Sequence, residues 1–343
     1  MRAFVLDRDG VGFADIADPR AGRDEVVLRT TAAGLCHSDL VIAARPPDQH
    51  SVDLPFVLGH ELAGTVVEVG EGVRSVAVGD EVVGYGPRGC GRCRRCVSGA
   101  ENYCCSTPVA APPGLGSDGA LAEYVAVSAR YLLPSAGVPA AQAAALSDAG
   151  LTAYHALDRA IVMAGRPADD LTIVIIGIGG LGHLAVRLAH HRGARVIAVE
   201  QQRDKRGLAA RLGADEVVDG GADTVAAIAD LTSGRGCDIV LDFVARRSTF
   251  ELGRSIISRD GVLSIVGVGT DRLEVGMHAL PLGVRTDLPF WGTRVELSRV
   301  LDLARRGVLD VVVEEHDFAQ IPAAYDRLEA GEVIGRAVIG MDH

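Results

Sequence analysis

The sequence predicts an α/β protein in which a doubly wound parallel sheet is inserted into a second domain made mostly of β-strands. Residues 171–200 read as a buried strand, a glycine turn, a helix and another strand, which is the repeating unit of open parallel sheets. Residues 1–145 contain short β-rich runs between turns, and mixed strands return after residue 308. A length of 343 residues also favours two hydrophobic cores over one.

The composition is typical of a soluble globular protein. Hydrophobic residues make up 48% of the chain and charged residues 23%. A net charge of −11 argues against nucleic acid or an anionic membrane as a partner. No apolar run approaches membrane-spanning length, and the N-terminal apolar run ends at Asp7, so we expect no signal peptide and a cytoplasmic protein.

The N-terminal part is expected to be an irregular barrel or sandwich. Its β-rich runs are residues 26–28, 64–69 and 81–83, and glycine and proline turns separate them. The alanine-rich segment 139–157 then changes the hydrophobic period to that of a helix. This change indicates the passage into the second domain.

The second domain begins with a nucleotide-binding pattern. Residues 171–176 are continuously apolar, as in a strand buried on both faces of a parallel sheet. In the turn that follows, Gly177 allows a sharp bend, Gly179 allows a pyrophosphate to approach the backbone, and Gly182 allows close packing of the helix. Gly180 and Leu181 complete this turn, so we predict that all five residues contact a dinucleotide.

An acidic residue completes the pattern. Glu200 ends the second strand about 20 residues after the turn, where a carboxylate binds the ribose hydroxyls of NAD and repels the 2′-phosphate of NADP. We therefore predict NAD as the cofactor, although Arg203, Lys205 and Arg206 follow closely and one of them could turn inward.

The remaining sequence completes both domains. Apolar runs at 216–218, 239–242 and 262–266 alternate with helical stretches, as in a doubly wound sheet, and residues 295–306 form an amphipathic helix that Gly307 ends. We expect residues 1–150 with 289–343 to form the mostly-β domain, with a cysteine-rich lobe at 88–106. Residues 151–288 then form the parallel-sheet domain.

Four cysteines give the most specific local signal. Cys90, Cys93, Cys96 and Cys104 have the spacing that lets four thiolates close a tetrahedral structural zinc site. An iron–sulfur cluster is the main alternative, but its usual run has a three-residue last gap followed by proline. Four unligated thiols are the remaining alternative.

Two further stretches are ambiguous when each is taken alone. Gly59-His60-Glu61 contains a histidine that could simply be packed in the core, and Cys36-His37-Ser38-Asp39 contains a single cysteine. Together they supply a sulfur and a nitrogen ligand for a metal ion.

These motifs resemble the zinc-dependent medium-chain alcohol dehydrogenases over the whole length of the chain. The resemblance is carried by residues 34–39, by 59–61, by the four cysteines, by Val78-Gly79-Asp80 and by the glycine turn. Through residues 148–152 and 291–294 the chain is most similar to bacterial NAD-dependent secondary-alcohol dehydrogenases. The resemblance implies a GroES-like catalytic domain and a Rossmann domain.

The family pattern also implies a catalytic zinc ion on Cys36, His60 and a third ligand, for which this chain offers Asp148. Many members have cysteine at this position, but a carboxylate preserves the charge balance and is an accepted zinc ligand. The alternative for Asp148 is the N-cap of a helix. Glu61 and Asp39 match positions that orient the ligands, and Glu61 could also approach the metal transiently.

Further roles are implied by the resemblance. Ser38 matches the hydroxyl that begins a proton relay, and His37 could form its outer end or bind the pyrophosphate. Thr152 matches a residue that touches the nicotinamide, and Arg336 matches a phosphate contact. The residues expected to line the substrate pocket are Val41, Leu115, Phe290 and Trp291.

We therefore expect a zinc-dependent alcohol dehydrogenase or ketone reductase that uses NAD, prefers secondary alcohols, including bulky or aromatic ones, and carries one catalytic and one structural zinc per chain. A homo-oligomer, dimer or tetramer, is implied. A polyol dehydrogenase of the same family is the first alternative. A nucleotide-binding structural or regulatory protein that has lost activity is the second.

Overall fold

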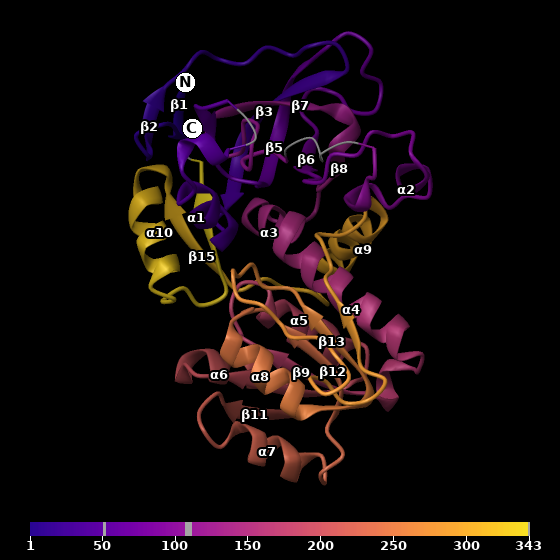
Figure 1. Cartoon of the computed structure of the whole chain (residues 1–343). Helices are drawn as coiled ribbons and strands as arrows, with labels where there is room; N and C mark the ends of the chain where they lie inside the picture. Colours follow the sequence, from indigo (N-terminus) through magenta and orange to yellow (C-terminus); the bar gives the residue numbers. More distant parts are fainter. Residues whose placement is uncertain (51–52, 107–111, 342–343) are drawn as a thin grey trace. The chain divides into compact units, whose positions relative to one another are not determined.

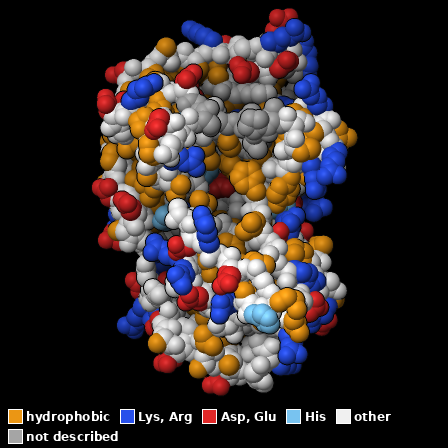
Figure 2. Space-filling model, in the orientation of Figure 1, with side chains coloured by type: hydrophobic (Ala, Val, Ile, Leu, Met, Phe, Trp, Pro, Cys, Tyr) orange, Lys and Arg blue, Asp and Glu red, His pale blue; other side chains and the backbone are white. Residues whose placement is uncertain are grey.

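The computed structural model describes residues 1–50, 53–106 and 112–341 (Figure 1). The chain folds into two compact units, Met1–Leu151 with Trp291–His343 and Thr152–Phe290. None of the helices in the described ranges is long and apolar enough to cross a bilayer. On the face shown in Figure 2, acidic and basic side chains are interspersed, unlike the basic stripe of a nucleic-acid-binding surface.

The first unit is mostly β, as predicted. A larger sheet has the strand order β15-β16-β3-β5-β6-β8, with β7 paired to β3, and a smaller one has the order β2-β1-β4. The strands are β1 (Arg2–Leu6), β2 (Val11–Asp15), β3 (Glu25–Gly34), β4 (Phe56–Val57), β5 (Glu61–Val69), β6 (Glu81–Gly84), β7 (Tyr124–Ser128), β8 (Leu132–Pro134), β15 (Val313–Asp317) and β16 (Arg336–Gly340).

Strand β3 is the centre of the larger sheet, because β5, β7 and β16 all pair with it. Seven of its ten residues are buried, so it lies within the core rather than at an edge. In its antiparallel pairing with β5, Gly34 lies opposite Glu61. The residues that follow β3 and precede β5 are therefore brought to one end of the sheet.

Short helices close the first unit. The α-helices are α1 (His37–Ala43), α2 (Arg94–Val97), α3 (Ala140–Ala145), α9 (Arg294–Arg305) and α10 (Ile321–Glu329). A π-helix, η4, spans Leu146–Gly150. The 3₁₀ turns are η1 (Pro47–Gln49), η2 (Glu101–Tyr103), η3 (Ala129–Tyr131) and η6 (Phe318–Gln320). Helix α3 packs on β3 and β5, and α10 packs on α1 and β15 (Figure 1). Thr293 and Glu296 form a capping box at the start of α9, which fixes where this amphipathic helix begins.

The second unit is the expected doubly wound sheet. Six parallel strands have the order β11-β10-β9-β12-β13-β14. They are β9 (Thr172–Ile176), β10 (Arg195–Glu200), β11 (Glu216–Asp219), β12 (Cys237–Asp242), β13 (Ile257–Ile265) and β14 (Arg285–Asp287). Its helices and 3₁₀ turn are α4 (Leu151–Ala164), η5 (Ala168–Asp170), α5 (Gly182–His191), α6 (Arg203–Arg211), α7 (Thr224–Leu231) and α8 (Arg247–Ile256).

The strand order reverses at β9, which has β10 on one side and β12 on the other. Ligands of open α/β sheets bind outside the carboxyl ends of the strands at such a reversal. The predicted glycine turn leaves β9 at this point, so the fold places it where a dinucleotide would bind.

Candidate active site

Three buried side chains of the first unit converge on one point. The donor atoms of Cys36, His60 and Asp148 all lie within 4.8 Å of one another. The Oδ2 atom of Asp148 is 3.3 Å from His60 Nε2 and 4.0 Å from Cys36 Sγ. A thiolate, an imidazole and a carboxylate are donors that zinc accepts in catalytic sites, so the residues present fit a zinc ion.

The strand pairing explains how distant residues meet here. Cys36 is the N-cap of α1, two residues after the end of β3, and His60 directly precedes β5. Because Gly34 and Glu61 are paired, these two ligands lie at the same end of the sheet. Asp148 lies in the middle of the π-helix η4, so it is no helix N-cap, and such π-turns are frequent at functional sites.

Asp39 holds two of the three candidate ligands. Its Oδ1 atom is 2.9 Å from His60 Nδ1, and its Oδ2 atom accepts the backbone N–H of Cys36 at 2.9 Å. An Nδ1–H directed at a carboxylate leaves Nε2 with a lone pair for a metal ion. The hydroxyl of Tyr325 also donates to Asp39 Oδ2, at 3.0 Å. Tyr325 lies on α10 and belongs to no motif of the sequence that would have indicated this contact.

A buried ion pair supports the third ligand. Arg336 Nε and Nη2 donate to Glu61 at 3.0 and 2.6 Å, and Glu61 Oε1 also accepts the N–H of Ala149 at 3.0 Å. Arg336 is only 3% exposed and lies 3.7 Å from Asp148 Oδ2. The guanidinium thus pairs within the first unit, and the phosphate contact that the resemblance implies for Arg336 stays a prediction.

The electrostatics of this cluster favour a bound cation. Burial raises the pKa of the Cys36 thiol, but the charge of Arg336 and the hydrogen bond from His60 outweigh it and lower that pKa. Burial opposes a charged His60, yet Asp39 and the contact with Asp148 raise the pKa of this imidazole well above its usual value. Burial also raises the pKa of Glu61 to about 7, against the effect of Arg336. Asp39 and Asp148 therefore favour a positive charge at His60, and a metal ion would supply that charge in place of a proton.

Trp291 packs beside the same cluster. Its ring meets the His60 ring edge to face, with centroids 5.6 Å apart, and its indole N–H donates to the carbonyl of Ser147 at 3.2 Å. Trp291 is 5% exposed and has a positive φ of 53°, a conformation that costs energy in a residue with a Cβ. The indole N–H of Trp291, the one side-chain donor among the four predicted pocket residues, is thus bonded to the backbone.

The other predicted pocket and relay residues are more accessible. Val41, on α1, is 37% exposed, and Leu115 is half-buried. Phe290 is the last residue of the second unit and is 41% exposed. On the first turn of α1, Ser38 Oγ lies 3.6 Å from Cys36 Sγ, and the adjacent His37 is exposed.

In the second unit, the glycine turn has the predicted geometry. Gly177 has a positive φ of 86°, and a Cβ on Gly182 would lie 1.8 Å from the Gly177 carbonyl oxygen. Both positions therefore require glycine, whereas Gly179 has open space above it. Gly180 and Leu181 directly precede α5, and Thr152 is buried in the same unit.

The carboxylate of Glu200 is fixed next to this turn. It accepts the N–H of Ile178 at 2.8 Å and that of Gln202 at 2.9 Å. Arg206 contacts the Glu200 carbonyl oxygen at 3.1 Å and the Asp219 carboxylate at 3.2 Å, and Lys205 is buried on α6. Arg203 is exposed. The side chain of Arg206, one of the three cations that follow Glu200, is therefore bound by groups of the second unit itself.

The four predicted cysteines form a second cluster. Cys93 Sγ lies 3.5 Å from that of Cys96 and 3.9 Å from that of Cys104, and Cys90 Sγ lies 3.9 Å from that of Cys96. All four sulfurs lie within 4.8 Å of one another, which fits one tetrahedral ion. Backbone N–H groups of Cys105 and Cys96 lower the pKa of Cys93 to about 5, so this thiol is readily ionised.

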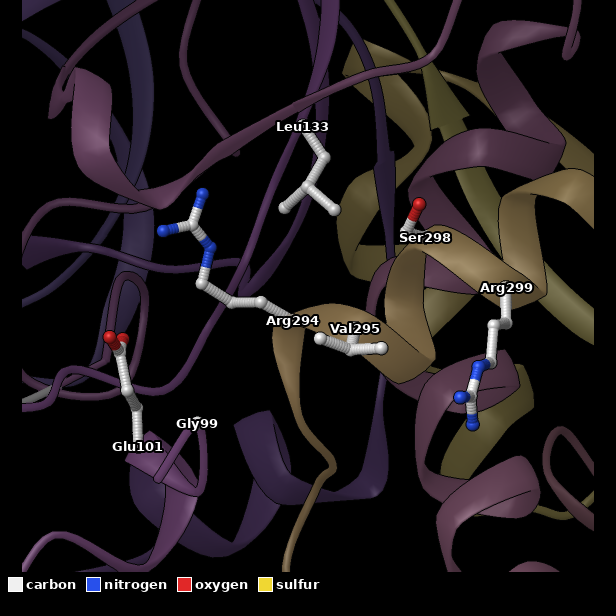
Figure 3. A pocket seen from close by; sticks show the side chains of 7 residues that line it. All are labelled: Gly99, Glu101, Leu133, Arg294, Val295, Ser298 and Arg299. Atoms are coloured by element: carbon white, nitrogen blue, oxygen red, sulfur yellow. The ribbon is translucent and has the colours of Figure 1, made fainter. Parts of the chain in front are cut away.

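Side chains outside the cluster fasten the cysteine-rich lobe to the β-domain. Arg130 Nη2 donates to Glu101 at 2.6 Å, and the Tyr131 hydroxyl donates to the carbonyl of Gly89 at 2.8 Å. A surface hollow of about 500 Å³ lies beside this lobe (Figure 3). Its lining residues are Gly99, Glu101, Leu133, Arg294, Val295, Ser298 and Arg299. None of them belongs to the predicted active site, so we assign the hollow no part in it.

Comparisons with known proteins agree with the geometry. A family model of the alcohol dehydrogenase GroES-like domain matches residues 22–139, and a model of the zinc-binding dehydrogenase matches residues 180–306. The chain is 33% identical to an alcohol dehydrogenase of Geobacillus stearothermophilus, over 99% of this chain and 98% of that protein.

Two solved structures are similar over nearly the whole chain. The alcohol dehydrogenase of Aeropyrum pernix is 34% identical, with a TM-score of 0.90, and the match covers 99% of this chain and 100% of that one. The acetophenone reductase of Geotrichum candidum, solved in complex with NAD, is 32% identical, with a TM-score of 0.86 and coverage of 99% and 96%.

The cysteine-rich lobe yields a test of metal-dependent folding. Cys96→Ser should remove about one zinc ion per chain and lower the melting temperature, because this lobe has little apolar core of its own. Cys105→Ser is the matched control, since Cys105 is exposed and lies outside the cluster. Metal analysis and thermal melting of both variants check the prediction. Equal zinc content in Cys96→Ser and the control would contradict it.

Proposed function

This chain belongs to the zinc-dependent medium-chain alcohol dehydrogenase family, and we propose that Cys36, His60 and Asp148 hold the zinc ion at which it acts on secondary alcohols and ketones. The chain is an NAD-dependent alcohol dehydrogenase that also reduces ketones. The observation that carries the proposal is the convergence of three donor atoms within 4.8 Å of one another.

The charge and number of the ligands suit catalysis. One thiolate and one carboxylate balance the charge of Zn²⁺, and the imidazole remains neutral. Three protein ligands leave a fourth position open, as catalytic zinc sites do. When bound, zinc would supply Lewis-acid chemistry at an alcohol or carbonyl oxygen, and NAD would supply the hydride acceptor.

The chain's own residues position the ligands and move the proton. Asp39 fixes the tautomer of His60, and Glu61 holds the π-turn of Asp148 through the Ala149 N–H. We assign Ser38 the first step of proton transfer, because its hydroxyl is half-buried beside Cys36. His37, exposed on the same turn of α1, is the proposed outer end of this route.

The four-cysteine cluster is proposed to hold the second, structural zinc ion. Four sulfur ligands close the coordination sphere and leave no position for substrate. Both ions together would give two zinc ions per chain. Because the thiolates must stay reduced, the proposal also favours a reducing compartment such as the cytoplasm.

The proposed substrate pocket favours apolar groups. Of the residues Val41, Leu115, Phe290 and Trp291, only Trp291 has a polar side-chain atom, and its N–H already donates to Ser147. A similar protein, by its name, reduces acetophenone, an aromatic ketone. These two observations support bulky secondary alcohols and ketones as substrates over polyols.

The two alternative functions find less support. A polyol dehydrogenase needs polar groups that bind several hydroxyls, whereas three of the four residues predicted to line the pocket have wholly apolar side chains. A protein that has lost activity would have no need of an intact ligand set. Both candidate metal clusters are complete, which favours the active enzyme.

We also propose a homo-oligomer, dimer or tetramer. Strand β14 lies at the end of the sheet order and has β13 as its partner, so its other edge can pair with a second copy. The apolar side chains of Val275 and Met277, which precede β14 in the chain, and of Leu288, which follows it directly, are exposed. A solution mass of one chain, 35.8 kDa, would contradict this proposal.

The third zinc ligand can be tested by substitution. Asp148→Ala should lose activity and about one zinc ion per chain while the cysteine-lobe zinc and the fold remain. Asp148→Cys is the matched variant, because a thiolate restores a zinc ligand of the same charge. Metal analysis, circular dichroism and kcat check both. Full activity and unchanged zinc in Asp148→Ala would remove Asp148 from the site.

Cofactor preference can be tested at the end of β10. Glu200→Gln should raise the kcat/KM for NADP relative to NAD by about tenfold, roughly 1.4 kcal/mol, because it removes the charge that repels the 2′-phosphate. Asp215→Asn is the control, since that carboxylate accepts the Val196 N–H near the opposite end of the strand. Steady-state measurement of kcat/KM with both cofactors checks this prediction. A wild-type preference for NADP would overturn the assignment of NAD as the cofactor.

Substrate size gives a further test. A 1-phenylethanol-like substrate should have a higher kcat/KM than ethanol by orders of magnitude, because each fitted methylene contributes roughly 1–3 kcal/mol. Val41→Phe should reduce turnover of the aromatic alcohol and spare ethanol, since the added ring fills the space that valine leaves. Higher kcat/KM for ethanol or for a sugar alcohol in the wild-type enzyme would contradict the preference.

A further inference from the structure

We propose that Tyr325 is a positioning residue for His60, which it holds indirectly by fixing the carboxylate of Asp39. The Tyr325 hydroxyl donates to Asp39 Oδ2 at 3.0 Å, and Asp39 Oδ1 lies 2.9 Å from His60 Nδ1. The inference rests on the proposed function, in which His60 binds the catalytic metal.

The three groups form a continuous buried chain. Tyr325 is 7% exposed, Asp39 1% and His60 3%. Tyr325 comes from α10, more than 280 residues after Asp39 in the sequence. At this depth, bulk water cannot replace a hydroxyl that is removed, so the carboxylate depends on the protein donors around it.

The hydroxyl has a role that the ring does not share. The Tyr325 ring stacks on Phe4, with centroids 6.1 Å apart and an interplanar angle of 27°. Phenylalanine would keep this packing. Among the described residues, the hydroxyl makes its one hydrogen bond to Asp39, so it serves the metal-ligand cluster rather than the core.

The geometry explains how the effect reaches the metal site. Asp39 Oδ2 accepts both the Cys36 N–H and the Tyr325 hydroxyl, and these two donors fix the plane of the carboxylate. That plane directs Oδ1 at the Nδ1–H of His60, and the ring then presents Nε2 to the cluster. If the Tyr325 hydroxyl were removed, the Cys36 N–H would be the one donor left to Asp39 Oδ2 among the described residues.

The test compares two hydroxyl deletions. Tyr325→Phe should lower the affinity of one of the two metal sites by about tenfold, the lower end of the range for groups that support a ligand from outside. Competition of zinc with a chelator measures this affinity. Tyr154→Phe is the matched control, because its hydroxyl accepts a hydrogen bond from Arg192 in the other unit. This control should leave both metal affinities unchanged.

Two further measurements separate positioning from packing. In the cobalt-substituted enzyme, the ligand-field absorption bands should shift in Tyr325→Phe and stay in place in Tyr154→Phe. Phe4→Leu, which disturbs the ring packing and keeps the hydroxyl, should lower the melting temperature and retain metal affinity.

Two outcomes would overturn the inference: wild-type metal affinity with an unshifted cobalt spectrum in Tyr325→Phe, or equal loss of metal in Phe4→Leu. Failure of the proposed function looks different. In that case the wild-type chain itself would bind metal at the cysteine lobe and at no second site.

Discussion

The antiparallel pairing of β3 with β5 is the constraint on which the site depends. It sets Gly34 opposite Glu61 and so brings Cys36 and His60 to one end of the sheet. The pairing leaves no room for a side chain at residue 34, because a Cβ there would lie 1.7 Å from the Glu61 carboxylate. A slip of one residue would turn every side chain of a strand to the other face and separate the ligands.

Burying so many charges together requires that each has a partner. Asp39 accepts hydrogen bonds from Cys36, His60 and Tyr325. Glu61 is paired with Arg336, and Asp148 lies close to both His60 and Arg336. Removing one member of a buried ion pair costs about 3–5 kcal/mol, because the other charge stays behind unpaired. Each of these side chains is therefore held by partners within the protein itself, and such support is what a metal site with fixed geometry needs.

The two units build their candidate sites from different parts of the chain: side chains in the first unit and mainly backbone in the second. In the first unit, function depends on side chains that converge from several elements. In the second, it depends mainly on backbone, since Gly177 and Gly182 shape a turn that admits no Cβ, and Glu200 is fixed by two backbone N–H groups. Because the glycine turn and Glu200 lie in one continuous stretch of the chain, residues 171–200, the sequence pattern was enough to predict both.

The sequence alone determined the features that are encoded locally: the glycine turn, the four-cysteine spacing, and a cysteine and a histidine in two short motifs. It also indicated Asp148, through resemblance. Only the tertiary structure decided that Arg336 pairs with Glu61, that the Trp291 N–H is bonded to Ser147, and that Tyr325 holds Asp39. These contacts join residues that lie far apart in the chain. The spacing of residues in a motif cannot indicate such a partner, because only the fold brings the two residues together.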